Sequence, residues 1–285
     1  MWHVTPFCTK LESMDSLTLH EVADELGVHY MTVYRYVRLG YLYAEKEGGS
    51  WRVRREDLDE FIAAPAPSGG RGKSDTPWDE RLEQRLLAAD QAGSWKVVEA
   101  AQAGGMSLGN IYRSVIAPAL RAIGQGWLDG SVSIAQEHAA TQVAMRTVSR
   151  LSAQIARRGV SKGTVVLGTP ATELHTLPLM IAADLIRLEG FEVLDLGSNL
   201  PADSFADTAA RQQRLVAIGI SVSAPDQADA IRETVDELRA HVDVPIFLGG
   251  SAIDGPEHAK LLGADFGGPT VDEIIPSLLE SVGSS

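Results

Sequence analysis

Residues 168–190 read GTPATELHTLPLMIAADLIRLEG, and this stretch decides which fold the sequence predicts. The apolar run Thr164–Leu167 comes directly before it and predicts a buried β-strand. Its second half repeats apolar residues at helical spacing, so we expect an amphipathic helix that ends near Gly190. A loop between such a strand and such a helix lies at the carboxyl edge of an open α/β sheet, where these folds bind ligands. The loop therefore predicts a binding site.

The loop carries one histidine, His175, and a carboxylate two residues before it, Glu173. A neutral imidazole at the end of a strand can bind a metal or transfer a proton, and a carboxylate can hold its second ring nitrogen. The alternative is a surface histidine that caps the helix, because one histidine does not make a metal site by itself. The loop alone leaves both interpretations open.

The following sequence predicts further strands of the same sheet. Short apolar runs separated by helical segments are typical of parallel strands buried between helices. The runs are Val193–Leu196, Leu215–Ile220 and Val244–Leu248, with Ala264–Phe266 as a fifth strand. We therefore expect residues 159–285 to form a doubly wound α/β domain, flavodoxin-like or Rossmann-like.

Small residues follow several of these runs. They are Gly197-Ser198-Asn199, Ser221 and Ser223, and Gly249-Gly250. Small side chains at neighbouring strand ends leave a narrow slot lined by backbone groups and hydroxyls, which suits a long, thin part of a ligand. Glycine and serine are also common in α/β loops without such a purpose, so composition alone leaves the slot open.

Residues 78–158 repeat their apolar positions with helical period. Breaks at residues 93–94, 104–105 and 124–130 predict a four-helix bundle. Trp127 lies at the last break, and Glu137 and His138 lie in the first turns of the helix after it. Together at one end of a bundle, these three side chains would form an aromatic wall with hydrogen-bonding edges. A core tryptophan and a satisfied histidine are the simpler alternative.

Residues 65–77 are rich in proline, glycine and serine, which predicts a flexible linker. Residues 1–64 before it predict a small winged helix-turn-helix domain. Thr18 and Glu21 have the spacing of a capping box, so a helix should run over Leu19–Leu26 and end at Gly27. A second helix is expected over Tyr30–Leu39, with Gly40 as its stop.

A hairpin wing should follow the second helix, because residues 41–46 and 51–53 alternate around a glycine-rich turn at residues 48–50. A short helix, Glu56–Ile62, closes the domain. Side chains that bond phosphates or base edges are expected on the outer face of the second helix and on the wing. They are Thr32, Tyr34, Arg35 and Arg38 on the helix, and Arg52, Arg54 and Arg55 on the wing. A helical domain that binds only protein is the alternative.

The composition sets limits on partners. The formal net charge of −13 argues against non-specific nucleic-acid binding by the whole molecule, although a local basic face can bind DNA. One cysteine, Cys8, excludes a disulfide framework and a cysteine-based zinc site and fits a reducing cytoplasm. No apolar run suits a signal peptide or a membrane span, so we expect a cytoplasmic protein without a membrane partner.

Three patterns resemble known families. The head is similar to the winged helix-turn-helix of MerR-type regulators and excisionases. The series Glu173-x-His175-x-x-Pro178, Ser221-x-Ser223 and Gly249-Gly250 resembles the cobalamin-binding signature in order and spacing. Trp127, followed after nine residues by Glu137-His138, resembles the bundle motif of light-sensing, cobalamin-dependent MerR-type repressors of the CarH/LitR family. Head, linker, bundle and sheet also follow that family's order, so the resemblance covers nearly the whole chain.

The resemblance implies a role for each candidate residue. His175 would be the lower ligand of cobalt, with Glu173 as its partner. The slot for the cofactor's nucleotide tail would be lined by Ser221, Ser223, Gly249 and Gly250. Trp127, Glu137 and His138 would cover an adenosyl group on the upper face of cobalt.

Two positions depart from that family. Pro178 replaces the last glycine of the signature, which adds bulk and removes an N–H while suiting the first turn of a helix. Leu128 stands where well-studied members have a histidine that captures cobalt after photolysis. His138 or water would therefore have to take the upper position in this chain.

The leading hypothesis is a non-enzymatic, light-responsive regulator that binds adenosylcobalamin and operator DNA and forms a homo-oligomer, a dimer or a tetramer. Photolysis of the cobalt–carbon bond would change its assembly and its DNA affinity. A second hypothesis is a corrinoid carrier for methyl transfer. A third, as in photocobilins, is a linear tetrapyrrole such as biliverdin beside or instead of adenosylcobalamin. Repressor action is expected from the resemblance, while the residues leave the sign of regulation open.

Overall fold

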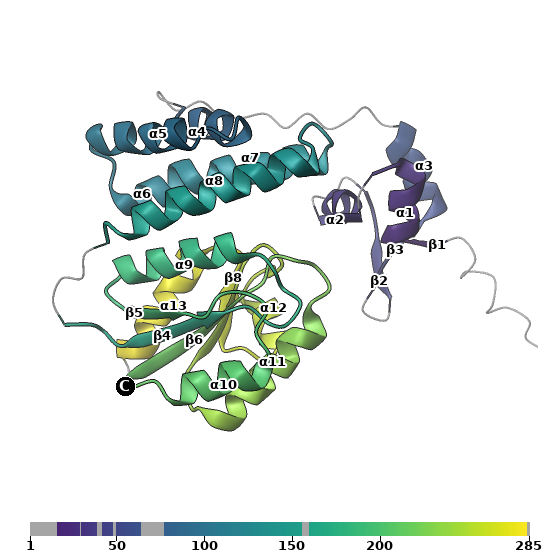
Figure 1. Cartoon of the computed structure of the whole chain (residues 1–285). Coiled ribbons are helices and arrows are strands. Elements are labelled where there is room, and N and C mark those ends of the chain that lie inside the picture. The colour runs from purple at the N-terminus through teal and green to yellow at the C-terminus, as the bar shows by residue number, and fades with distance from the viewer. Residues whose placement is uncertain are drawn as a thin grey trace, which may run out of the picture.

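The computed structural model describes residues 16–28, 30–38, 42–47, 50–63, 77–155 and 160–283 of the chain. Figure 1 shows a small head, a helical bundle and an α/β domain. The predictions for the end of the second helix at residues 39–40, the turn at 48–49, the linker at 65–76 and Cys8 lie outside the described residues.

The α/β domain is a parallel sheet with helices on both faces, as the sequence predicts. Its strand order is β5-β4-β6-β7-β8, which is the order of flavodoxin-like folds. The strands are β4 Thr164–Gly168, β5 Glu192–Asp195, β6 Leu215–Ser221, β7 Ile246–Gly249 and β8 Phe266–Gly268. The helices are α9 Thr176–Leu188, α10 Ala202–Ala210, α11 Ala228–His241, α12 Pro256–Leu261 and α13 Val271–Gly283.

Two separate cores hold this sheet between its helices. Helices α9 and α13 cover one face with side chains such as Leu179, Ile186 and Leu278. Helices α10, α11 and α12 cover the other, where Phe205 and Leu238 are fully buried. Apolar burial on both faces explains why the strands read as continuous apolar runs rather than alternating ones.

Three of the predicted strands begin at other residues than expected. Strand β5 starts one residue earlier than Val193, and β7 starts at Ile246 rather than Val244. Pro245 has no N–H for a ladder, and the amide of Ile246 instead donates to the Asp265 carboxylate at 2.7 Å. Strand β8 begins only after Asp265, at Phe266, because Asp265 holds the start of β7.

The bundle contains four helical rods over residues 78–152, but the break predicted at residues 93–94 is wrong, and the break predicted at residues 124–130 is present only from Asp129 onward. The first two rods are α4 Trp78–Leu87 and α5 Gln91–Ala103. The third rod is continuous through α6 Leu108–Ile111, the π-helical turn η1 Tyr112–Ile116 and α7 Ala117–Leu128, and the fourth is α8 Ile134–Ser152.

Local hydrogen bonds explain where the breaks fall. Gly93 and Ser94 lie inside α5, because Asp90 caps that helix by accepting from the amide of Gly93 at 2.8 Å. Gly124 and Gly126 lie inside α7, and the missing Cβ of Gly126 leaves room for Val132 of the following turn. The break predicted at residues 104–105 is confirmed.

The bundle rests on the α/β domain through α9, as Figure 1 shows. Leu177, Ile181 and Leu185 of α9 repeat every four residues and belong to the same buried cluster as the bundle core. Helix α9 therefore packs on the sheet with one face and on the bundle with another. This helix also begins at the loop that carries His175.

The head is a helix-turn-helix with a three-stranded wing. Its helices are α1 Leu19–Leu26, α2 Tyr30–Arg38 and α3 Arg55–Ala63, and the predicted capping box of Thr18 and Glu21 is present. The predicted hairpin pairs β2 Glu45–Glu47 with β3 Ser50–Arg54, so Ser50 and Arg54 are strand residues and the first strand starts later than expected. A further strand, β1 Ser16–Thr18, pairs with β3 and was not predicted.

Candidate functional site

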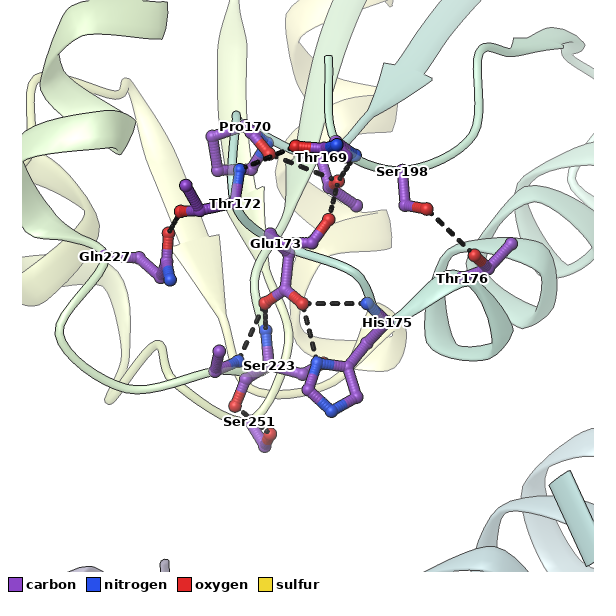
Figure 2. A network of polar contacts seen from close by, with 12 residues as sticks. Thr169, Pro170, Thr172, Glu173, His175, Thr176, Ser198, Ser223, Gln227 and Ser251 are labelled. Carbon is purple, nitrogen blue, oxygen red and sulfur yellow. Dashed lines mark hydrogen bonds and ion pairs between the residues drawn. The ribbon is translucent and has the colours of Figure 1, made fainter. Parts of the chain in front are cut away.

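His175 stands at the N-cap position of α9, but its side chain does not cap the helix. The imidazole Nδ1 lies 2.6 Å from Oε1 of Glu173, which also accepts from the backbone N–H of His175 at 2.9 Å. An ionised carboxylate only accepts hydrogen bonds, so Nδ1 carries a hydrogen, and in the neutral ring the lone pair is on Nε2. Figure 2 shows the ring with its second nitrogen turned away from Glu173. The interpretation of His175 as a helix cap is therefore wrong.

The Glu173 carboxylate joins two loops of the sheet. It is fully buried, and its Oε2 accepts from the backbone N–H groups of Ser223 at 2.6 Å and Ala224 at 2.7 Å. Burial alone would raise the pKa of Glu173, but the hydrogen bonds from His175 and from these amides outweigh it and lower the pKa to about 2. Glu173 therefore stays ionised and fixes the His175 ring against the loop after β6.

The contact with Glu173 raises the pKa of His175 above its ordinary value. The main cause is the hydrogen bond to Glu173, which outweighs the effect of burial, and the charges of Glu173 and of Glu137 in α8 add to it. The ring is nevertheless accessible, with 59% of the side chain exposed. A fixed ring with an accessible Nε2 and a carboxylate on Nδ1 is the arrangement in which proteins hold a metal-binding histidine.

Sequence reasoning placed Asn199 near a strand end but missed Thr169 and Thr172, which shape this loop with it. Thr169 donates its hydroxyl to the carbonyl of Glu173 at 2.8 Å, and the amide of Asn199 donates to that carbonyl at 2.9 Å. Thr172 has a positive φ of 72° and donates its N–H to the Asn199 side chain at 2.8 Å. These contacts appear in Figure 2 around the labelled Thr169 and Thr172. The signal in the sequence was Thr169, a hydroxyl residue that directly follows the buried strand β4 and can hydrogen-bond within the loop.

The predicted slot residues lie together at the ends of β6 and β7. Ser221 is buried at the end of β6, and the amide of Val222 donates to the carbonyl of Gly249 at 2.7 Å. Gly250 has a φ of +111°, and a Cβ there would lie 2.2 Å from the carbonyl oxygen of Val222. The close packing of the two loops therefore already requires a glycine at position 250.

The bundle residues predicted for the upper face lie at one end of the bundle. Trp127 is the penultimate residue of α7, and a tight turn follows in which the amide of Val132 donates to the carbonyl of Gly126 at 2.8 Å. Glu137 lies 2.7 Å from Nδ1 of His138 and accepts from the Thr141 hydroxyl at 2.7 Å. The His138 side chain is 74% exposed. The negative charge of Glu137 also contributes to the raised pKa of His175.

The predicted DNA-contacting residues fall on α2 and β3. Thr32, Arg35 and Arg38 belong to α2, and their side chains lie outside the described residues. Val33 and Val37 are buried, so the opposite face of α2 is its outer face. Tyr34 is partly buried, and its ring stacks on Tyr30 with centroids 6.5 Å apart.

On the wing, Arg52 is partly buried and Arg54 is exposed. Arg54 pairs with Asp57 at 2.9 Å and lies over the Tyr43 ring at 5.5 Å. Arg55 is not a wing residue, because it begins α3 and forms an ion pair with Glu25 of α1. The Tyr30 hydroxyl at the start of α2 donates to Asp226. Asp226 lies in the loop after β6, and two backbone amides of the same loop donate to Glu173.

A cobalt cofactor fits these residues. Among the described residues there is no group of three or more side chains that could hold a bare metal ion. A corrinoid brings most of the ligands of its own cobalt, so the protein would need to add only one nitrogen, which the accessible Nε2 of His175 could supply. Within the same residues, no helix is long and apolar enough to cross a membrane.

Comparison with known proteins gives the same three parts in the same order. A helix-turn-helix domain family matches residues 16–65, and two B12 binding domain families match residues 78–152 and 163–274. The solved monomethylamine corrinoid protein of Methanosarcina barkeri shares the fold of the bundle and the sheet. Its TM-score is 0.64 at 15% identity, and the match covers 73% of this chain and 99% of that one.

Two curated relatives extend the comparison. The chain is 22% identical over 200 residues to trimethylamine corrinoid protein 1 of Methanosarcina acetivorans, covering 68% of this chain and 92% of that protein. It is 32% identical over 202 residues to the HTH-type transcriptional repressor CarH of Myxococcus xanthus, covering 68% of this chain and 66% of the repressor. The matched part is thus just under two thirds of the repressor's length. With a helix-turn-helix domain before two B12 binding domains, the chain belongs to the family of CarH-like, B12-dependent regulators.

Proposed function

We propose that this B12-binding regulator holds adenosylcobalamin between the carboxyl edge of the sheet and the Trp127 end of the bundle, and that light acts on it there. The observation that carries the proposal is the His175 ring, which Glu173 holds in one tautomer with Nε2 accessible. Glu173 already holds Nδ1, so the His175 ring would need no rearrangement before its Nε2 binds cobalt. The cofactor supplies a cobalt–carbon bond that light can break.

The chain's own residues hold the two sides of this site. On the sheet side, Glu173 would keep the His175 nitrogen available to cobalt, and Ser221, Ser223 and the two glycines at positions 249 and 250 would line the path of the nucleotide tail. On the bundle side, Trp127 offers an aromatic surface to the adenine, while Glu137 and His138 offer hydrogen bonds to the sugar. Loss of the adenosyl group would leave an apolar void and unmatched polar groups, which favours a shift of the bundle.

The bundle shift is expected to act on DNA through assembly. Several heads in one oligomer bind neighbouring half-sites at high effective concentration, while separated heads lose this avidity. In this proposal Thr32, Tyr34, Arg35, Arg38, Arg52 and Arg54 contact the operator. Replacing Arg52 with Ala should lower the salt slope of binding by about one unit. Arg55→Ala is the matched control, because Arg55 pairs with Glu25 within the head.

A corrinoid carrier for methyl transfer is the second candidate, because corrinoid proteins share the fold of the bundle and the sheet. The helix-turn-helix domain at residues 16–65 favours the regulator, since a carrier has no use for a DNA-binding head. A methylated corrinoid that the protein presents to a methyl acceptor at a rate comparable with dedicated carriers would favour the second candidate.

The experiment that tests the proposed function is the solution mass of the protein loaded with adenosylcobalamin, in the dark and after green light. We expect a larger assembly in the dark and a smaller one after illumination, with weaker DNA binding. The same experiment on Trp127→Ala should give a smaller difference between dark and light. An identical mass in dark and light for the parent would refute light-coupled assembly with this cofactor. Biliverdin loading, followed by its absorption spectrum, then decides whether a linear tetrapyrrole takes its place.

A further inference from the structure

Asp184 is a fully buried carboxylate on α9 that joins the α/β domain to the bundle. Its Oδ2 accepts hydrogen bonds from the hydroxyl of Tyr112 at 2.5 Å and from the hydroxyl of Ser152. Its Oδ1 accepts from Arg187 at 2.8 Å, which lies one turn further along α9. We call Tyr112, Ser152 and Asp184 the distal contact.

The partners of Asp184 come from two different rods of the bundle. Tyr112 begins the π-helical turn η1, and Ser152 ends α8. Burial and the hydrogen bond to Asp184 both raise the pKa of Tyr112, so its hydroxyl stays protonated and can donate at neutral pH. Without these two donors, Oδ2 of the buried carboxylate would lose its hydrogen bonds and only the contact of Oδ1 with Arg187 would remain, which makes the contact specific for this arrangement of the two domains.

The π-helical turn explains how Tyr112 reaches α9. Pro118 lies in the first turn of α7 and has no N–H to donate to the preceding turn. The amide of Ala117 bonds to the carbonyl of Tyr112, five residues back, so the turn is one residue wider than in an α-helix. Tyr112 is fully buried there, and its neighbour Arg113 forms an ion pair with Asp272 of α13 at 2.6 Å. One wide turn thus supplies two polar contacts to the α/β domain.

The contacts of Asp184 lie far from the cofactor end. Along α8, Ser152 is roughly 22 Å from Glu137 at the ordinary helical rise, and along α9 Asp184 is roughly 13 Å from His175. The cofactor end instead presents large apolar side chains to solvent, with Leu174 at 69% and Ile134 at 59% exposure. Polar contacts with specific geometry hold the distal end, while the cofactor end has apolar surface that a ligand can cover.

We propose that the distal contact is the pivot of the bundle, and that Asp184 is the positioning residue that fixes it. The bundle then tilts about this end, and the Trp127 end alone opens and closes over His175. The link from this tilt to a corrin rests on the function proposed above, whereas the pivot itself does not.

Pulsed EPR distances between spin labels at the two ends test the pivot. The chain has one cysteine, so Cys8→Ser gives a clean background for paired labels. One pair, at Ala135 and Ser204, spans the cofactor end, and the other, at Ser149 and Gln213, spans the distal end. For the cofactor-free parent we expect a narrow distance distribution at the distal pair and a broader one at the other. Loading with hydroxocobalamin should narrow and shift only the pair at the cofactor end.

Three variants remove the distal contact, namely Tyr112→Phe, Ser152→Ala and Asp184→Asn. Each should broaden the distal distribution, with the helical signal of the folded protein retained. Ser152→Thr keeps the hydroxyl and should restore the narrow distribution. Thr147→Val is the matched control, because the Thr147 hydroxyl is buried in the same helix but donates to the carbonyl of Val143 within it.

A distal distribution that stays narrow in Tyr112→Phe and Ser152→Ala would overturn the proposal. So would a parent whose two ends are equally broad or move equally on loading. If hydroxocobalamin leaves no spectrum of bound cofactor, the proposed function fails, and the cofactor-free distances in the parent and the variants still decide whether the distal end is a pivot.

Discussion

The lower and upper sides of the candidate cofactor site are built in different ways. Below, the His175 ring is held by Glu173, which is fully buried and accepts four hydrogen bonds from two loops. Above, His138 is 74% exposed, and the Glu137 beside it is on the same helix. The positions of His175 and Glu173 are fixed by loops of the sheet, while the positions of Glu137 and His138 depend on the placement of the bundle relative to the sheet.

This difference matches what each side has to do. A permanent axial ligand benefits from a ring held in one orientation, because no rearrangement is needed when cobalt binds. A side that responds to a change of upper ligand needs residues with more than one stable arrangement. The comparison therefore predicts that substitutions below the ring change affinity, and that substitutions above it change the response to light.

The largest effect is expected from His175→Ala, which removes the proposed lower ligand. Corrinoid affinity should fall by more than the about 10–100-fold that outer-shell partners of metal ligands contribute. Any cofactor still bound should have the absorption spectrum of a base-on or water-ligated form. Titration followed by absorption measures both. Unchanged affinity and spectrum would remove His175 from the site.

The next effect concerns acid stability of the cofactor-free protein. The pKa of Glu173 is lowered from 4.5 to about 2, so its contribution is complete above pH 4.5 and is lost as pH falls toward 2. A shift of this size corresponds to about 3 kcal/mol of unfolding free energy. Denaturant unfolding at several pH values should show this loss in the parent, and a flatter dependence in Glu173→Gln. Equal slopes in both proteins would mean that the carboxylate is not held as described.

A smaller effect is expected on corrinoid affinity in Glu173→Gln. The glutamine side chain has one acceptor oxygen where the glutamate has two. Either the His175 ring or the backbone N–H groups of Ser223 and Ala224 therefore lose their acceptor. Affinity should fall about 10–100-fold. Glu137→Gln is the comparison above the ring, and its affinity should fall by less than that of Glu173→Gln, because a glutamine can still hydrogen-bond to a sugar. Equal losses in both variants would abolish the distinction between the two sides.

The smallest effect on affinity is expected from His138→Gln. An exposed side chain above the ring should change binding in the dark by less than about threefold, since it is largely solvated already. The spectrum after illumination should differ from the parent's, because His138 is the histidine nearest Trp127 along the chain. A dark affinity that drops as far as in His175→Ala would show that His138 is a ligand in the resting state.

The sequence predicted what depends on local patterns. Helix α1 with its capping box, the parallel strands and the pairing of Glu173 with His175 follow from spacing along the chain. The second role of Glu173, as acceptor for the loop after β6, could not be predicted because that loop is near only after folding. Strand β1 and the contact of Asp184 with Tyr112 were missed for the same reason.

The break before α5 was missed because glycine was weighted above capping. Asp90 provides a side-chain acceptor for the amide of Gly93, and this starts the helix at Gln91, two residues before the glycine. Gly126 stays helical because the turn after α7 folds back over it. Capping residues are therefore the better guide to helix ends in this bundle.

The central claim is that the protein presents the Nε2 of His175 to cobalt from below, and EPR of nitrogen-15-labelled protein tests it most directly. The protein is loaded with unlabelled cobalamin and reduced to the cobalt(II) state, in which the lower axial nitrogen splits the cobalt lines. A histidine of the labelled protein gives doublets, and we expect doublets in the parent that are lost in His175→Ala. Triplets in the labelled parent, from the cofactor's own unlabelled base, would contradict the account.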